Sequence, residues 1–258
     1  GCSRVSEGCR FCYAEIVAAR FSGAGMAYEG LARQVEGQGA RWTGEVRFVE
    51  ESLALPLQWR KPRRIFVNSM SDLFHEKVPD AWIDRIFVVM ALAGRHTFQV
   101  LTKRPERMRA FLTEMCPRPL PNVWLGVSVE DQATADERIP LLLSTPAAVR
   151  WVSYEPALGP VDFSPWLVKM VRPDAPLHMD PPYPVPHLDW LVIGGESGAK
   201  ARQFDLHWGR TAIAQCKTAG VPVFMKQLGS KPTTSITTRP AGESWVQLYK
   251  DKKAGDPS

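Results

Sequence analysis

The sequence predicts an α/β fold: a (β/α) barrel or partial barrel of about six to eight parallel strands, with a proline-rich insertion. From residue 65 onward, short apolar runs rich in β-branched and aromatic residues alternate with longer amphipathic stretches. The apolar runs are almost continuously hydrophobic, as expected of strands buried on both faces. Each run ends in polar residues, which favours a barrel with one shared site over an open sheet with a single switch point.

Six strands are expected from the apolar runs, at residues 63–70, 97–103, 122–130, 149–156, 188–197 and 221–227. The segment 46–50 is a candidate seventh strand. Because the sequence begins with Gly1 rather than Met, we expect a preceding segment, which would have room for a further strand.

Four helices are expected between these strands, at residues 79–92, 105–115, 131–144 and 205–220. Pro79 and Pro105 suit the first turn of a helix, where a missing N–H costs nothing. Gly220 suits the C-terminal cap of the last helix, since glycine readily adopts a positive φ.

The expected organisation is one barrel domain over residues 1–229, followed by a polar peripheral segment at 230–258. The insertion at 159–187 contains eight prolines, so it cannot form a regular helix and is expected to be an extended loop. It is either a surface excursion without function or a lid or docking arm.

Composition narrows the class of protein. The chain has 258 residues, of which 45% are hydrophobic, and neither a membrane-length apolar run nor a secretory signal. Five cysteines, three of them bunched, argue against an exported disulfide scaffold and for a reducing cytoplasm. The net charge of +5 comes with basic clusters at 60–64, 103–109 and 250–253. These clusters either track phosphates or are solvated surface.

Polar residues at the strand ends predict a cavity at the mouth of the barrel, because the carboxyl ends of barrel strands ring the active site. Carboxylates directly after apolar strands are costly to bury without a partner. We therefore expect them to receive a ligand with ammonium, hydroxyl or guanidinium groups. The alternative is a ring of internal ion pairs, such as Lys226 with Glu196. The predicted cavity residues are Ser69, Asp72, Ser128, Glu130, Glu155 and Glu196.

Three cysteines, Cys2, Cys9 and Cys12, have the spacing C-x6-C-x2-C. A structural zinc site requires four protein ligands, and only Asp72 or His75 is a candidate for the fourth. Three thiolates fit better a 4Fe–4S cluster with one iron open to a ligand. Unligated or redox-active thiols are the remaining possibility.

A helix that begins near Phe11 would place Cys12 in its first turn, where free N–H groups favour a thiolate. Tyr13 would then place its ring over the cluster or its ligand. A cluster beside a polar cavity at the opening of a barrel is the arrangement needed to cleave S-adenosylmethionine reductively, in a dry interior that protects a radical.

Seven stretches of the chain carry a resemblance to a known family: GCSRVSEGCRFCYAE, FVNSMSDLFHEKVP, FQVLTKRPERM, VWLGVSVEDQ, VSYEPALGPVD, DWLVIGGESG and VPVFMKQLG. In this order, from Gly1 to about Gly229, they resemble a phage- and prophage-associated three-cysteine family. That family is itself similar to an unorthodox branch of the radical S-adenosylmethionine superfamily.

The superfamily resemblance implies a 4Fe–4S cluster on the three cysteines, S-adenosylmethionine as cofactor and an external electron donor. The C-x2-C half with its following aromatic, Cys9, Cys12 and Tyr13, matches the superfamily, whereas the first gap of six residues is longer than its usual three. The Gly-Gly-Glu motif of the superfamily follows the second strand. Here GGE stands late, at 194–196, so Asn68, Ser69 and Asp72 are the candidates for its role.

Three functional hypotheses follow. The first is a radical S-adenosylmethionine-type enzyme whose substrate is left open between nucleic acid, a peptide and a small molecule. The second is a zinc-stabilised nucleic-acid-binding barrel protein without catalysis. The third is a hydrolase that uses Asp72, Glu130 and Glu155 as acid and base.

Overall fold

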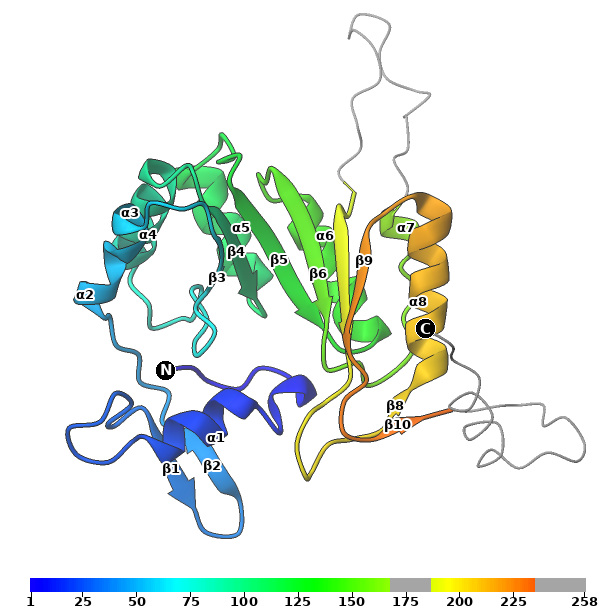
Figure 1. Ribbon diagram of the computed structural model, residues 1–258, viewed down its shortest axis with the longest axis horizontal. Helices are drawn as coiled ribbons and strands as arrows, with labels where there is room; N and C mark the ends of the chain where they lie inside the picture. The colour runs from blue at the N-terminus through cyan, green and yellow to red at the C-terminus, as the bar shows by residue number, and fades with distance from the viewer. Residues whose placement is uncertain (168–186, 235–258) are drawn as a thin grey trace, which may run out of the picture.

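A six-stranded parallel sheet, curled into a half-barrel, forms the centre of the computed structural model, which describes residues 1–167 and 187–234 (Figure 1). Its strand order is β3-β4-β5-β6-β7-β9, so β3 and β9 are the two open edges. The α/β class and the six predicted strands are confirmed, each within a few residues. The strands are β3 (Arg64–Val67), β4 (Thr97–Thr102), β5 (Val123–Val129), β6 (Val149–Tyr154), β7 (Trp190–Gly194) and β9 (Val223–Gln227).

The four predicted helices are present as α4 (Asp80–Leu92), α5 (Pro105–Met115), α6 (Gln132–Leu143) and α8 (Leu206–Ala219). Local chemistry sets their ends. The Asp131 carboxylate caps α6 by accepting from the Thr134 backbone N–H at 2.9 Å. Gly220 ends α8 with a φ of 68°, as its sequence position predicts.

The hydrophobic core lies between the convex face of the sheet and these helices. Side chains alternate along each strand, so every second residue reaches the core. On β5 and β6 these are Leu125, Val127, Val152 and Tyr154, all buried. The residues between them face the concave side, and the half-barrel therefore has two chemically different faces.

The N-terminal segment lies across the carboxyl ends of the strands (Figure 1). It contains a 3-10 helix, Glu7–Cys9, then α1 (Tyr13–Arg20) and an antiparallel hairpin of β1 (Ala32–Val35) and β2 (Gly39–Trp42). Two short helices, α2 (Glu50–Leu53) and α3 (Leu55–Gln58), lead into β3. The hairpin was not predicted.

The candidate strand at 46–50 is wrong. Residues 46–49 are irregular and Glu50 begins α2. The apolar residues of this segment serve side-chain packing instead of strand pairing. Val46 packs against the core, and the ring of Phe48 lies 5.1 Å from that of Trp82.

The proline-rich insertion is described only at its two ends. Its beginning contains a four-residue helix, α7 (Ser164–Leu167), which the proline content did not predict. Residues 168–186 lie outside the described ranges, so the extended loop and the lid or docking role remain predictions there. In the C-terminal segment, β10 (Pro232–Thr233) pairs in parallel with β8 (Phe204–Asp205), and 235–258 lie outside the described ranges. Within the described ranges, no helix combines the length and apolar character required to span a bilayer.

Candidate functional site

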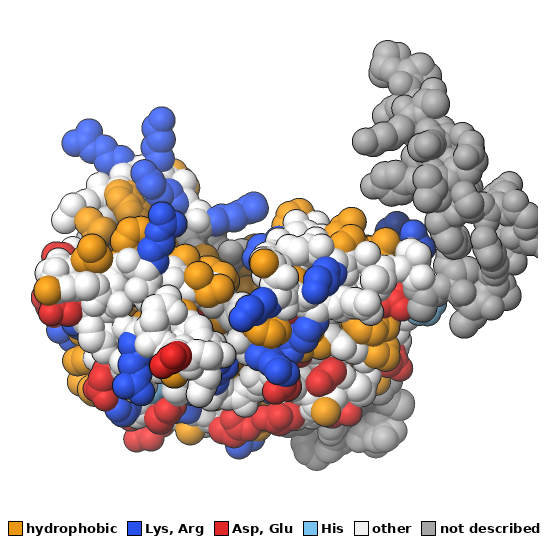
Figure 2. All heavy atoms as spheres, turned by 90° about the horizontal axis from the view of Figure 1, so that it is seen from below, with side chains coloured by type: hydrophobic (Ala, Val, Ile, Leu, Met, Phe, Trp, Pro, Cys, Tyr) orange, Lys and Arg blue, Asp and Glu red, His pale blue; other side chains and the backbone are white. Residues whose placement is uncertain are grey.

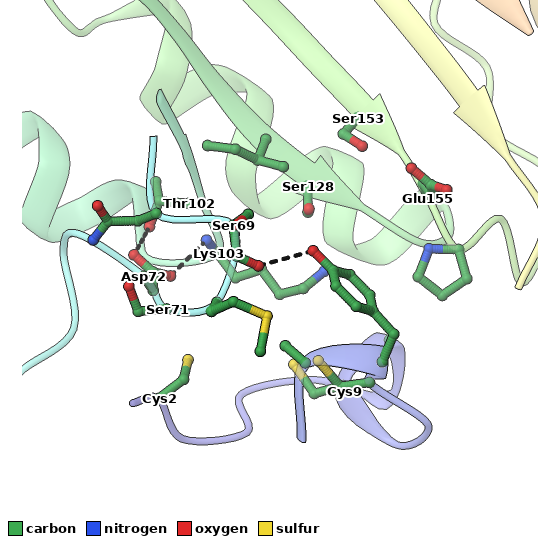
Figure 3. A pocket seen from close by; sticks show the side chains of 18 of the residues that line it. Cys2, Cys9, Ser69, Ser71, Asp72, Thr102, Lys103, Ser128, Ser153 and Glu155 are labelled. Carbon is green, nitrogen blue, oxygen red and sulfur yellow. Dashed lines mark hydrogen bonds between the residues drawn. The ribbon is translucent and has the colours of Figure 1, made fainter. Parts of the chain in front are cut away.

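A cavity of about 300 Å³ lies at the carboxyl ends of the strands, beneath the N-terminal segment (Figure 3). Every strand of the large sheet contributes to its wall through its last residues or the loop that follows. All three bunched cysteines line it, together with Tyr13. Of the predicted cavity residues, those that line it are Ser69, Asp72, Ser128, Glu155 and Glu196.

The cysteines enter the cavity from a single loop. Cys9 ends the 3-10 helix, and Cys12 is the N-cap of α1, which begins two residues after the predicted start at Phe11. Figure 3 shows Cys2 and Cys9 on the same side of the cavity, opposite the strand ends. The topology thus brings together three thiols that the sequence places within eleven positions.

Burial raises the pKa of two of these thiols, those of Cys2 and Cys12. It raises the pKa of Cys2 to about 11, with the charge of Asp72 acting in the same direction and that of Arg104 opposing it. Burial also raises the pKa of Cys12, although the backbone N–H groups of Glu15 and Ala14 lower it. At Cys12 the start of the helix favours the thiolate as predicted, but desolvation outweighs it. A bound metal would favour the thiolate form of Cys2 and Cys12.

The spacing of the thiols bears on which metal they suit. Within 1–167 and 187–234, no three His, Cys, Asp or Glu side chains are grouped closely enough to share one metal ion. Sulfurs on a single tetrahedral zinc stand roughly 3.8 Å apart, given Zn–S bonds of about 2.3 Å. In a 4Fe–4S cluster each thiolate binds a different iron, so the sulfurs stand farther apart. Cys2, Cys9 and Cys12 thus line one cavity, but within the described residues they are not grouped as ligands of a single metal ion.

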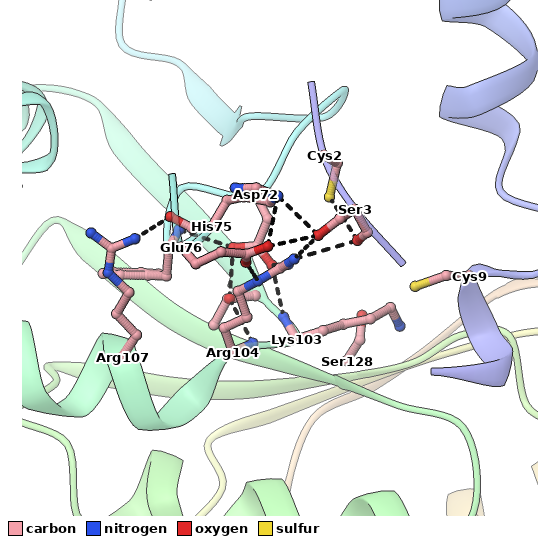
Figure 4. Close-up of polar contacts among 12 residues, drawn as sticks. Cys2, Ser3, Cys9, Asp72, His75, Glu76, Lys103, Arg104, Arg107 and Ser128 are labelled. Atoms are coloured by element: carbon pink, nitrogen blue, oxygen red, sulfur yellow. Dashed lines mark hydrogen bonds and ion pairs between the residues drawn. The ribbon is translucent and has the colours of Figure 1, made fainter. Parts of the chain in front are cut away.

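Arg104, two residues after the end of β4, anchors the beginning of the cysteine loop (Figure 4). Its guanidinium donates to the Ser3 hydroxyl at 2.8 Å and to Glu76 at 2.9 Å. It also pairs with the buried Asp72 at 3.0 Å. Asp72 additionally accepts from the Thr102 hydroxyl at 2.7 Å, so this carboxylate is saturated by the protein's own donors. Its position makes it an anchor for the loop.

Glu130, directly after β5, fastens the middle of the loop. It is 1% exposed and does not line the cavity, although it was predicted to. Its carboxylate accepts from the Ser6 hydroxyl at 2.9 Å and pairs with Arg138 at 3.2 Å and with Lys103. A Cβ at Gly8 would overlap this carboxyl group, so only glycine lets the loop pass here.

Glu196, after β7, holds the loop indirectly. It pairs with Arg202 at 2.6 Å, and Arg202 donates to the backbone carbonyl of Glu7 at 2.9 Å. The expected Lys226–Glu196 pair is absent from the described residues. Lys226 pairs with Glu155 instead, at 2.9 Å. All four predicted carboxylates thus have a cationic partner. This is the internal ion pairing expected as the alternative to a ligand, but the pairs differ from the Lys226–Glu196 example.

The glycines of GGES serve packing within the chain. A Cβ at Gly194 would stand 2.8 Å from the Glu155 carboxyl carbon, and one at Gly195 would stand 2.5 Å from the Leu228 carbonyl oxygen. Their small size therefore lets β7 approach the end of β6 and the loop after β9.

Two serines on neighbouring strands offer polar groups to the cavity. Ser128 on β5 and Ser153 on β6 are register partners, and both face the cavity (Figure 3). Among the described residues, neither hydroxyl has a hydrogen-bond partner that would compete with a ligand. Ser153 was not predicted. The sequence signal for Ser153 is its spacing. It lies two residues after Trp151 and two before Glu155, which directly follows β6, so alternation places all three on one side.

Tyr13 and Ser69 close one side of the cavity. The Tyr13 hydroxyl donates to the Ser69 backbone carbonyl at 2.8 Å and so ties α1 to the loop after β3 (Figure 3). Asn68, the residue before Ser69, has a φ of 60°, a left-handed conformation that asparagine tolerates better than most residues. This turn directs the chain from β3 back over the cavity.

Nearly the whole chain matches one protein family. A family described as "Protein of unknown function (DUF5131)" matches residues 1–254. The chain belongs to this family. Neither a search of curated proteins nor a search of solved structures found a match. The DUF5131 description names no activity, substrate or cofactor, but its extent shows that the cysteine loop and all six strands belong to one family unit.

Proposed function

We propose that this DUF5131 protein is a radical S-adenosylmethionine-type enzyme, in an unorthodox branch of that superfamily. The observation that carries the proposal is the convergence of Cys2, Cys9 and Cys12 on one cavity at the carboxyl ends of a half-barrel. Strand-end hydroxyls face the same cavity. The three thiols would hold a 4Fe–4S cluster, and the cavity would hold S-adenosylmethionine beside it.

A bound cluster of this kind supplies the electron, received from an external donor, that cleaves S-adenosylmethionine into methionine and a 5′-deoxyadenosyl radical, which then takes a hydrogen atom from the substrate. The protein's own residues would bind S-adenosylmethionine and enclose it. Ser128 and Ser153 face the cavity with hydroxyls that form no hydrogen bond to another described residue. Tyr13 supplies a ring at the cavity wall, and the cysteine loop lies over the strand ends.

Glu155 is the predicted carboxylate best placed to meet the cofactor. Its side chain is 18% exposed, and its partner Lys226 is half exposed, so this pair can open at a small cost. Asp72 and Glu130 are held by buried or nearly buried cations. We therefore assign Asp72, Glu130 and Glu196 to positioning the cysteine loop, and Glu155 to binding.

The zinc hypothesis gains no fourth ligand from the predicted candidates. Both ring nitrogens of His75 have partners, since Nε2 lies 2.9 Å from the Ser3 hydroxyl and Nδ1 accepts from the Lys77 backbone N–H at 3.1 Å. Asp72 is saturated. The hydrolase hypothesis needs at least two carboxylates free to carry protons, and two of its three, Asp72 and Glu130, are held by buried or nearly buried cations.

Anaerobic reconstitution with iron and sulfide, followed by dithionite and S-adenosylmethionine, tests the proposal. The expected products are 5′-deoxyadenosine and methionine in equal amounts. Cys116→Ser changes a cysteine outside the loop and serves as the matched control, which should retain cleavage. Cys9→Ser should abolish it. Cleavage that is absent from the wild type, or unaffected by Cys9→Ser, contradicts the proposal.

A further inference from the structure

The concave face of the half-barrel carries a cluster of aromatic rings that the proposed chemistry does not use. Ring centroids are 6.4 Å apart for Phe66 and Trp151, 5.3 Å for Trp151 and Trp190, and 5.9 Å for Trp190 and Trp124. Their strand neighbours, such as Ile65 and Leu125, pack into the core on the other face. The four rings therefore lie on the concave side of the half-barrel, with Trp151 buried among them.

The two open edges of the sheet expose aromatic side chains on the same face. Phe66 on edge strand β3 is 43% exposed, and Phe224 on edge strand β9 is 54% exposed. Phe224 is the register partner of Val192 on β7, and its neighbours Val223 and Met225 pack against the core. We call the set formed by Phe66, Trp124, Trp151, Trp190 and Phe224 the aromatic face.

The aromatic face is continuous with the cysteine cavity. Phe66 belongs to the aromatic cluster and also lines the cavity. On β6, Trp151 is followed two residues later by Ser153, which faces the cavity. Phe66 is therefore the member of the aromatic face that borders the cavity with the three thiols.

Four cations flank the β3 edge of the aromatic face: Arg60, Lys61, Arg63 and Arg64. All are exposed, and none forms an ion pair within the described part of the chain. Arg64 precedes Phe66 by two residues and so shares its face. By contrast, Arg104 and Arg85 elsewhere in the chain are paired with carboxylates.

The charge distribution is visible from the side on which the N-terminal segment lies. Figure 2 shows a hollow in this surface, with hydrophobic side chains at its edge and Lys and Arg side chains on both sides. Asp and Glu side chains gather mainly along the lower edge of this view, away from the hollow. A hollow of this character suits an extended ligand with apolar planar groups and repeated negative charge.

We propose that the aromatic face binds single-stranded nucleic acid. Bases stack on exposed aromatic rings whatever their sequence, and a row of cations tracks the backbone phosphates. Here Phe66 and Phe224 would receive bases while residues 60–64 contact phosphates. The inference extends the proposed function by naming the polymer whose bases reach the cavity, but the binding itself requires no cluster.

Fluorescence anisotropy with labelled oligonucleotides of roughly 12 nucleotides tests it, using DNA and RNA versions of one sequence and the corresponding duplex. The wild type should bind single strands more tightly than duplex. Phe66→Ala and Phe224→Ala should each weaken binding roughly 5- to 100-fold. Phe21→Ala is the matched control, since Phe21 is 46% exposed and lies at the end of α1, and it should leave binding unchanged.

The charge contribution is tested by the salt dependence of binding. Combined Arg60→Ala, Lys61→Ala and Arg64→Ala should lower the slope of log affinity against log salt by about 0.7 for each phosphate that is no longer neutralised. Arg109→Ala and Lys217→Ala, which remove exposed cations from helices α5 and α8, are the controls. Circular dichroism checks that each variant is folded.

Three outcomes overturn the inference: equal losses in Phe66→Ala and Phe21→Ala, binding of inorganic polyphosphate as tight as that of the oligonucleotides, and self-association that requires Phe66 and Phe224 while oligonucleotides do not bind. Binding that survives in a Cys2→Ser, Cys9→Ser, Cys12→Ser variant supports it independently of the proposed enzyme activity. Loss of cleavage with retained binding would count only against the proposed function.

Discussion

The hydroxyl of Ser6 donates a hydrogen bond of 2.9 Å to the carboxylate of Glu130, 124 positions along the chain. This hydrogen bond joins the middle of the cysteine loop to the end of β5. Arg104 and Arg202 make comparable hydrogen bonds to Ser3 and Glu7. The charged residues at the strand ends thus hold the thiols over the cavity.

Glu130→Ala should be strongly destabilising. It leaves Lys103 and Arg138 without their shared carboxylate, and both cations are largely buried. Removing one partner of a buried ion pair typically costs about 3–5 kcal/mol. The free energy of unfolding, measured with urea, should fall by that amount, whereas the exposed control Glu137→Gln should change it little. Equal values for the two variants would mean that Glu130 does not anchor the loop.

Gly8→Ala should disturb the loop without removing any charge. The new Cβ would overlap the Glu130 carboxyl group, which cannot swing aside because three partners hold it. We expect a loss of about 1–3 kcal/mol in unfolding free energy and reduced iron loading. Gly94→Ala is the control, since its nearest atom would be the Ala91 carbonyl oxygen at an ordinary 3.7 Å. An unperturbed Gly8→Ala variant would show that the loop is not tightly packed against β5.

Ser128→Ala and Ser153→Ala should weaken S-adenosylmethionine binding and leave the fold unchanged. Among described residues these hydroxyls have no hydrogen-bond partner, so removing them costs the protein little. Each variant loses one hydrogen bond to the ligand, worth about 0.5–1.5 kcal/mol, or roughly 2- to 12-fold in the dissociation constant. Isothermal titration of the reconstituted protein measures the change. Ser52→Ala, on the exposed surface of α2, should bind S-adenosylmethionine normally. An equal loss of affinity in this variant would contradict the role assigned to Ser128 and Ser153.

Glu76 makes the anchor of the loop sensitive to acid. Burial raises the pKa of this carboxyl, but hydrogen bonds from its own backbone and from Ser3, with the charge of Arg104, lower it to about 2. A carboxyl with a depressed folded-state pKa stabilises the protein above its ordinary value of 4.5, and this contribution is lost as the pH falls toward 2.

The difference in unfolding free energy between the wild type and Glu76→Gln should therefore be largest above pH 4.5 and decrease as the pH falls toward 2. Ser3→Ala removes one of the hydrogen bonds to Glu76, so it should narrow the pH range over which this difference changes. A difference that stays constant from about pH 2 to about pH 6 would contradict this origin of the acid sensitivity.

The sheet and its helices were predictable because their signals are local. The strand at 123–129 is continuously apolar, and the helix before Gly220 ends where a left-handed glycine allows it. The hairpin of β1 and β2 was missed because its residues are mostly half-exposed and it is held by α1, as in the hydrogen bond from the Trp42 backbone N–H to Glu15.

The site was predictable only in part. Cys2, Cys9 and Cys12 are close in sequence, so their convergence required no knowledge of the fold. The strand-end carboxylates were located correctly, but their partners Arg202, Arg138 and Ser6 come from separate elements. Only the folded chain shows that Glu130 does not line the cavity and pairs with Arg138 and Lys103, and that Ser153 lies on the cavity wall.

The iron content of anaerobically reconstituted protein, measured together with its visible absorption spectrum, tests the central claim most directly. The account predicts about four irons per chain with a broad sulfur-to-iron charge-transfer band in the wild type and in Cys116→Ser, and loss of both in Cys2→Ser, Cys9→Ser and Cys12→Ser. One zinc per chain without visible absorbance, or full iron loading after loss of any of the three thiols, would contradict it.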